Sequence, residues 1–222
     1  MNKNHGTNYI SDYGLSLVVR TFRRGNDTTW TEPTWVGAKG RSGPLLFVSP
    51  IEAEIFRILR NNRESDDPQE SHNWRRISLS KFDLYQHVID CAGRLECMLS
   101  LGFSTTLEGE VLAPTGAPRT VHVPMPFTVP KGSPRPTFSF NGWVFDFMRE
   151  QWKIIGATNY ADQLDDLNSL DNDTINALAK EAISQVAFTQ HVPDVTDWGV
   201  FIPDTKQWKM GPPEARQKKS FH

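Results

Sequence analysis

Apolar residues alternate without a break between residues 95 and 103, and this pattern constrains the fold more than any other in the chain. The apolar positions are Leu95, Cys97, Leu99, Leu101 and Phe103. A spacing of two places every second side chain on the same face of a β-strand. We therefore expect a β-strand here, and a fold in which a sheet is the main element.

The clearest helix signal lies at residues 49–52. Ser49 can cap the free amides of a helix start, Pro50 suits the first helical position, and Glu52 completes a capping box. Apolar residues then recur on one helical face as far as Leu59. The same type of spacing predicts a second helix near residues 81–92 and a third near 175–186.

Strands outnumber helices in this order of elements, and hairpin links favour antiparallel pairing. We therefore expect an α+β fold, with one domain, a mainly antiparallel mixed sheet and about three helices packed on one face of it. The 222 residues suit one larger domain, and 13 Phe and 7 Trp can build a sizeable core. The expected boundaries are a flexible N-terminus over residues 1–12, the domain over 13–210, and a disordered basic tail over 211–222.

Two segments have a composition that is typical of turns or loops. The sequence Asn141-Gly142 lies between aromatic residues, and it predicts a type I′ turn in a hairpin over residues 138–145. Residues 23–44 are rich in Gly, Thr and Pro, which indicates a long irregular loop. That loop contains Trp30 and Trp35.

No sequence motif of a known catalytic centre is present: there is no nucleophile elbow, phosphate-binding glycine loop or metalloprotease helix. His87 and Cys91 are four residues apart on the second expected helix, but the second ligand pair of a zinc site is missing. The acidic stretch 162–173 lacks the central Gly and distal Glu of a calcium loop, so Asp171 or Asp173 is expected to cap a helix instead. We therefore expect neither a metal nor another cofactor.

Compartment and charge give only general constraints. Two cysteines, Cys91 and Cys97, are too few for a disulfide framework, which favours a reducing cytoplasm. No stretch of about 20 apolar residues predicts a membrane span. The 24 basic and 26 acidic residues do not give the strong positive charge of a dedicated duplex-binding protein.

Two regions have the composition of a binding surface. Trp and Arg dominate binding hot spots, which draws attention to Trp30, Trp35 and Arg41. An exposed acidic stretch can attract a basic partner, and Asp162, Asp165 and Asp166 form such a stretch. The opposing interpretation is that both tryptophans fold back over the core.

The preferred hypothesis is a non-catalytic accessory protein that binds another protein, for example a bacterial immunity protein or inhibitor that neutralises a toxin by occluding it. A first alternative is a single-stranded nucleic-acid binder that uses the Trp and Arg residues of 23–44. A second is a hydrolase or metal-assisted enzyme built on His87, Cys91, His191 or the Asp stretch. The sequence favours a role other than catalysis and leaves an enzyme open.

Overall fold

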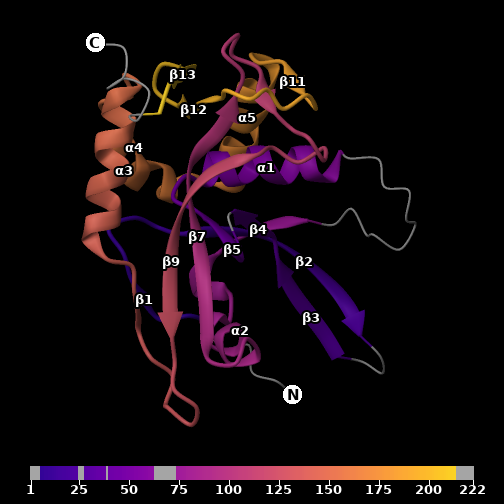
Figure 1. Ribbon diagram of the computed structural model, residues 1–222, viewed down its shortest axis with the longest axis vertical. Helices are drawn as coiled ribbons and strands as arrows, with labels where there is room; N and C mark the ends of the chain where they lie inside the picture. Colours follow the sequence, from indigo (N-terminus) through magenta and orange to yellow (C-terminus); the bar gives the residue numbers. More distant parts are fainter. Residues whose placement is uncertain (1–5, 25–27, 39, 63–73, 214–222) are drawn as a thin grey trace.

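A mixed sheet of eleven strands forms the main body of the protein, and a two-stranded sheet accompanies it. The structure is a computed structural model, and it describes residues 6–24, 28–38, 40–62 and 74–213. Figure 1 shows the long strands near the middle of the molecule and helices at both ends and along one side.

The bounds of the elements follow the chain. The strands are β1 (Tyr9–Ile10), β2 (Ser16–Arg24), β3 (Thr28–Pro33), β4 (Trp35–Ala38), β5 (Arg41–Phe47), β6 (Arg75–Ser78), β7 (Arg94–Thr105), β8 (Val111–Leu112), β9 (Thr120–Thr128), β10 (Phe138–Ser139), β11 (Phe188–Thr189), β12 (Asp197–Ile202) and β13 (Gln207–Gly211). The helices are α1 (Pro50–Asn61), α2 (Leu84–Asp90), α3 (Gly142–Ile154), α4 (Tyr160–Ser169) and α5 (Asn172–Ser184), with one 3-10 turn at Leu79–Lys81.

Strand β7 is the centre of the large sheet and contains the alternating residues 95–103. It pairs with β9 along nearly its whole length, and with β5 and β12 over shorter stretches. In the large sheet the β5–β7 and β8–β11 pairs are parallel, and the other pairs are antiparallel. The predicted α+β class with a mainly antiparallel mixed sheet is therefore confirmed.

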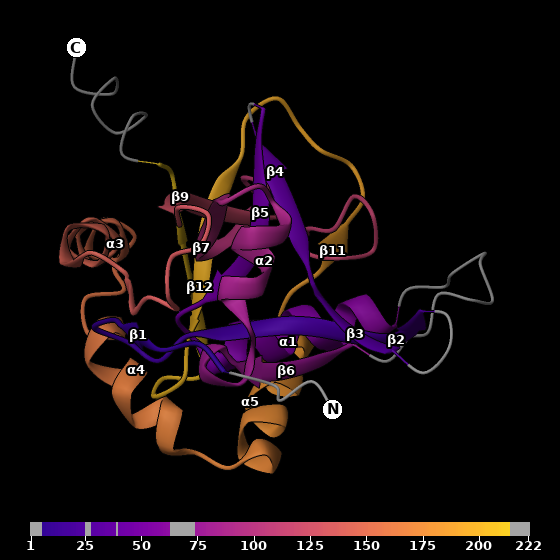
Figure 2. The same ribbon diagram turned by 90° about the horizontal axis from the view of Figure 1, so that it is seen from below.

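The helices differ from the prediction in number and place. The described residues form five α-helices where about three were expected. The helices were also predicted to pack on one face of the sheet, and they do not. Figure 1 places α1 and α5 near the upper end of β7 and α2 near its lower end, while α3 stands along the left side of the molecule in Figures 1 and 2.

The start of α1 is confirmed as a capped helix. The hydroxyl of Ser49 accepts a hydrogen bond from the amide of Glu52 at 3.3 Å, and Pro50 is the first helical residue. The start of α5 is likewise capped by Asp171, whose carboxylate accepts from the amide of Thr174 at 2.7 Å. These two local predictions needed no tertiary information, because a cap satisfies amides within the same turn.

The predicted hairpin over 138–145 is wrong. Asn141 is the residue before helix α3, and within this segment only Phe138 and Ser139 form a strand, β10. The buried residues that follow, Val144, Phe145, Met148, Gln151 and Trp152, recur with helical spacing. The aromatic residues on both sides of Asn-Gly suggested cross-strand pairs, but the longer helical pattern decides the structure.

The expected irregular loop over 23–44 is also wrong, because its described part forms strands. β2 pairs with β3, and β4 pairs with β5, in two antiparallel ribbons. The acidic stretch was not expected to be helical, yet α4 covers residues 160–169. Both ribbons join strands that follow one another in the chain, and their content of Gly, Thr and Pro suggested a loop instead.

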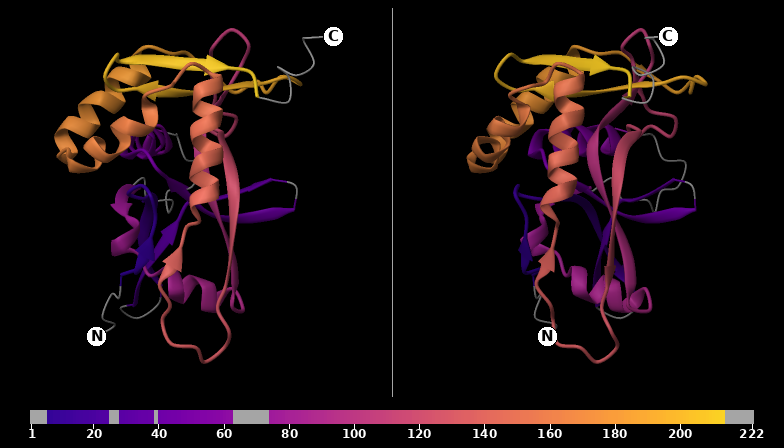
Figure 3. Two further views of the ribbon diagram at one scale, coloured as in Figure 1. Left: turned by 90° about the vertical axis from the view of Figure 1, so that its left-hand side faces the viewer. Right: turned by 60° about the vertical axis from the view of Figure 1, so that its left-hand side comes forward.

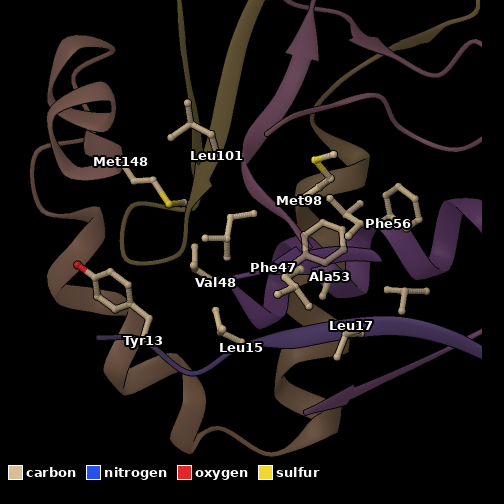
Figure 4. Close-up of a cluster of buried hydrophobic side chains, with 14 of the residues drawn as sticks. Tyr13, Leu15, Leu17, Phe47, Val48, Ala53, Phe56, Met98, Leu101 and Met148 are labelled. Carbon is tan, nitrogen blue, oxygen red and sulfur yellow. The ribbon is translucent and has the colours of Figure 1, made fainter. Parts of the chain in front are cut away.

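The core lies where the strands of the sheet meet α1 and α3. Figure 4 shows side chains from β2, β5, α1, β7 and α3 turned toward one another around Phe47. Phe47 and Phe56 have ring centroids 5.5 Å apart. In the N-terminal segment, β1 pairs with β10, and the Thr7 hydroxyl accepts a hydrogen bond from the amide of Leu84.

The ends of the chain are described only in part. The C-terminal tail predicted over 211–222 lies mostly outside the described residues, and Gly211 is the last residue of β13. No helix in the described part of the chain is long and apolar enough to cross a membrane.

Candidate binding surface

The β4–β5 hairpin carries two of the residues singled out by the sequence, Trp35 and Arg41. Trp35 lies opposite Pro44, and Ala38 lies opposite Arg41. Gly40 has a positive φ of 79° in the turn between them, a conformation that favours glycine. Figure 2 shows this hairpin projecting away from α4 and α5.

Gly43 allows the hairpin to lie directly against β7. A Cβ atom at Gly43 would be 1.5 Å from the carbonyl oxygen of Glu96, so no larger residue fits there without moving the backbone. The amide of Leu45 also donates to the carbonyl of Thr34 at 2.9 Å. The hairpin is thereby held in one position on the sheet, which gives Trp35 and Arg41 a rigid base.

A hollow of about 510 Å³ opens between this hairpin, the start of β7 and the end of β9. Trp35 is 41% exposed at its border. The Arg41 side chain is 60% exposed, and its Nε lies 3.9 Å from the Glu96 carboxylate. The complete lining is Trp35, Gly40, Arg41, Ser42, Cys91, Arg94, Leu95, Glu96, Pro126, Phe127 and Thr128. We refer to these residues as the Trp35 surface.

A second hollow, of about 420 Å³, adjoins the first. The two share Pro126, Phe127 and Thr128 of β9, and the second extends to Trp143 at the start of α3. Phe127 is half-buried and packs edge-on against Phe138, with ring centroids 5.3 Å apart. An apolar path therefore runs from Trp35 across the end of β9.

The structure brings together only part of the predicted site. Trp35 and Arg41 share one hollow, whereas Trp30, 38% exposed on β3, does not line it. Both tryptophans are thus partly exposed, and neither is among the buried residues of the core.

The three candidate acidic residues lie elsewhere. Asp162, Asp165 and Asp166 are exposed on α4. Figure 2 places α4 on the other side of the molecule from β4 and β5. A single small partner site cannot include both the Trp35 surface and this acidic face.

Sequence reasoning missed Arg94, Glu96 and Phe127, which also line the hollow. Arg94 and Glu96 are the even-numbered residues of the alternating segment, so their shared side was already fixed by the period of two. What the sequence did not contain is which strand lies beside them. Strand β5 supplies Gly43 next to Glu96, and that neighbour forms the border of the hollow.

Among the described strands, none pairs with the edge of β9 that faces away from β7, and two prolines protect this edge against pairing with another strand. Pro124 and Pro126 lie opposite Met98 and Glu96 of β7. Since proline has no N–H, these are the positions whose backbone groups point away from β7. Two donors that an added strand would need are therefore missing, and binding by strand addition is disfavoured at this edge.

A separate polar cluster is fully enclosed beneath α1. Glu52, Ser49 and Tyr160 are each 1% exposed, and Ser100 is 0% exposed. The Tyr160 hydroxyl donates to Glu52 Oε1 at 2.9 Å, while Glu52 Oε2 and the Ser100 hydroxyl have no hydrogen-bond partner. Burial raises the pKa of Glu52 to about 8, and the nearby hydroxyls of Tyr160 and Ser100 offset this only partly. At neutral pH the carboxyl is therefore mostly protonated in the folded protein.

Among the residues that the structure describes, the cysteines and His87 do not form a catalytic or metal centre. Burial raises the pKa of Cys97, and burial followed by the charge of Asp90 raises the pKa of Cys91. Burial lowers the pKa of His87, whose ring stacks on Phe82 with centroids 4.5 Å apart. In the part of the chain that is described, no three His, Cys, Asp or Glu side chains come together as metal ligands.

No protein-family model, no curated protein and no solved structure matches this chain.

Proposed function

We propose that this protein is a non-catalytic binding protein that recognises another protein through the Trp35 surface. One observation carries the proposal: a partly exposed tryptophan and an exposed arginine lie on a hairpin that packs against β7, at the border of an open hollow. Tryptophan and arginine contribute most to protein interfaces, because they bury a large area and make directional contacts. The hollow also has half-buried Phe127 on its far side, which offers a second apolar contact.

The proposal extends to the role of such a contact. A protein that binds through a rigid, pre-formed surface can block the site of its partner, as an inhibitor or immunity protein does. We place such a role in the cytoplasm of a bacterium, with a toxin as the partner. The exposed face of Asp162, Asp165 and Asp166 is a separate contact in this scheme, used only by a partner large enough to reach α4.

Binding of single-stranded nucleic acid is the second candidate. The observation in its favour is that Arg41 and Arg94 share the hollow with Trp35, so that phosphates and a stacked base have candidate partners. Glu96 argues against it, because its carboxylate lies under Arg41 and repels phosphate. The protein-binding proposal is preferred for this reason.

The experiment begins with a photo-crosslinking residue at Ser42, which is exposed in the hollow. The captured protein is identified and purified, and its affinity is measured for Trp35→Ala and Arg41→Glu. We expect each change to weaken binding about tenfold or more, since hot-spot residues have effects of that size. Trp30→Ala is the matched control, because Trp30 has nearly the same exposure but lies outside the hollow.

Two results contradict the proposal. One is a purified partner that binds Trp35→Ala and Arg41→Glu as tightly as the unmodified protein. The other is quenching of tryptophan fluorescence by oligothymidylate that Trp35→Ala abolishes and added salt weakens. The second result supports the nucleic-acid candidate in its place.

A further inference from the structure

Helix α3 has an apolar stripe on its outer side that no part of the proposed binding function uses. Trp143 is 57% exposed and Phe147 41% exposed, although both are large and apolar. Ile154 continues the stripe and is half-buried. Figure 3 shows α3 along the side of the molecule, facing the viewer in the left-hand view.

The spacing along this stripe is that of a short coiled-coil seam. Trp143, Phe147, Glu150 and Ile154 are separated by four, three and four residues, which places them on one face of the helix. Glu150 is the one polar member, and its carboxylate binds Lys153 at 2.7 Å on the flank of the stripe. The opposite face of the helix, which includes Met148 and Trp152, is buried against the core.

The charges beside the stripe have a self-complementary order. Asp146 and Lys153 are seven residues apart, so they lie on the same flank, with Asp146 near the start of the helix and Lys153 near its end. Their side chains are 73% and 53% exposed. Each has an ion-pair partner within α3, but the exposure leaves room for a further contact.

From this pattern we infer that α3 is the contact between two copies of this chain, arranged antiparallel about a two-fold axis. In that arrangement the start of one helix lies beside the end of the other. Asp146 then faces Lys153 of the second copy, and the symmetry repeats the pair. In a parallel arrangement the flank of Asp146 and Lys153 would face the opposite flank of the second helix, so these two residues would not meet, and only the antiparallel arrangement forms the two ion pairs.

The extent of the contact sets the expected strength. A helix of 13 residues is about 20 Å long at 1.5 Å per residue. An interface centred on so short a stripe is at the small end of specific interfaces, so the dimer should be weak and reversible. We expect its dissociation constant in the micromolar range.

Sedimentation velocity of the full chain over a wide concentration range tests this inference. The unmodified protein should change reversibly from monomer to dimer. Asp146→Lys alone and Lys153→Asp alone should each weaken dimerisation about tenfold or more, because two symmetric attractions become repulsions. The double variant Asp146→Lys/Lys153→Asp exchanges the charges and should dimerise better than either single variant.

Two controls separate the contact from folding and from the proposed function. Lys180→Glu changes an exposed charge on α5 and should leave the dimer unchanged. Phe147→Asp should give a monomer with unchanged circular dichroism and an intact Trp35 surface. A protein that stays monomeric at all concentrations overturns the inference, as does a dimer that survives Phe147→Asp or a double variant no better than the single ones.

Discussion

Replacing Glu52 with Gln should remove most of the pH dependence of stability between about pH 4.5 and 8. The pKa of this buried carboxyl is raised from 4.5 to about 8 by burial. The folded protein therefore binds a proton more tightly than the unfolded chain does. Its contribution to stability is complete below pH 4.5 and is lost as pH rises through 8, at about 1.4 kcal/mol per pH unit.

The glutamine variant has no charge to desolvate at any pH. Its side-chain oxygen can still accept from Tyr160, and its amide group replaces Oε2, the oxygen without a partner. At pH 8 we expect the variant to be more stable than the unmodified protein by on the order of 4 kcal/mol, and at pH 4.5 to be nearly equal to it.

Urea unfolding of both proteins at several pH values measures this difference directly. Glu108→Gln makes the same chemical change at an exposed position and serves as the control. A difference in unfolding free energy between Glu52→Gln and the unmodified protein that stays constant from pH 4.5 to 8 would show that folding does not raise the pKa of Glu52.

For Glu52, the position in the helix could be predicted from the sequence, but the burial could not. The predicted capping box is not formed, because one oxygen of the Glu52 carboxylate accepts from Tyr160 and the other has no hydrogen-bond partner. The place of Glu52 in the first turn, with its amide bound to the Ser49 hydroxyl, was predictable from residues within that turn. Its burial was not, since a glutamate in the first turn of a helix is usually exposed. Tyr160, the group that satisfies one of its oxygens, is 108 residues away in the chain.

In the candidate site, likewise, the residue types could be predicted from the sequence but their grouping in space could not. Trp35 and Arg41 could be selected from their residue types alone, because those types dominate interfaces. Their separation from Trp30 could not, since it depends on β3 pairing with β2 while β4 pairs with β5. The glycine and proline residues of this segment predicted a loop in place of the β2–β3 and β4–β5 pairs. Gly43 is nevertheless the residue that allows β5 to lie against β7.

Helix α4 was missed for a different reason. Its acidic residues drew attention to charge, while Tyr160, Leu164 and Leu167 already had helical spacing. Here the helical spacing is present in the sequence, but it spans only a short apolar series. The Asn141-Gly142 error is the reverse, because a strong local turn signal outweighed a longer helical pattern that began one residue later.

Replacing Trp152 with Ala should have the largest effect of any single truncation in α3. The side chain is 1% exposed, and its indole Nε1 donates to the carbonyl of Leu101 on β7 at 2.9 Å. Its ring packs edge-on against Tyr160 of α4, with centroids 5.0 Å apart, and lies 6.4 Å from the ring of Tyr13. One side chain therefore joins α3 to the sheet, to α4 and to the segment before β2.

Truncation removes the packing of all three contacts and leaves a cavity, so we expect a loss of about 3–5 kcal/mol in the free energy of unfolding. Trp152→Phe keeps part of the ring but leaves the carbonyl of Leu101 without this donor, and should lose about 1–3 kcal/mol. Trp143→Ala, measured in dilute protein, removes the same side chain from an exposed position of the same helix and should change stability by less than about 0.5 kcal/mol.

Equal losses for Trp152→Ala and Trp143→Ala would contradict the role of Trp152 as the anchor of α3. Because the Trp35 surface is built by β4, β5, β7 and β9, a Trp152→Phe protein that remains folded should still bind a partner there with unchanged affinity.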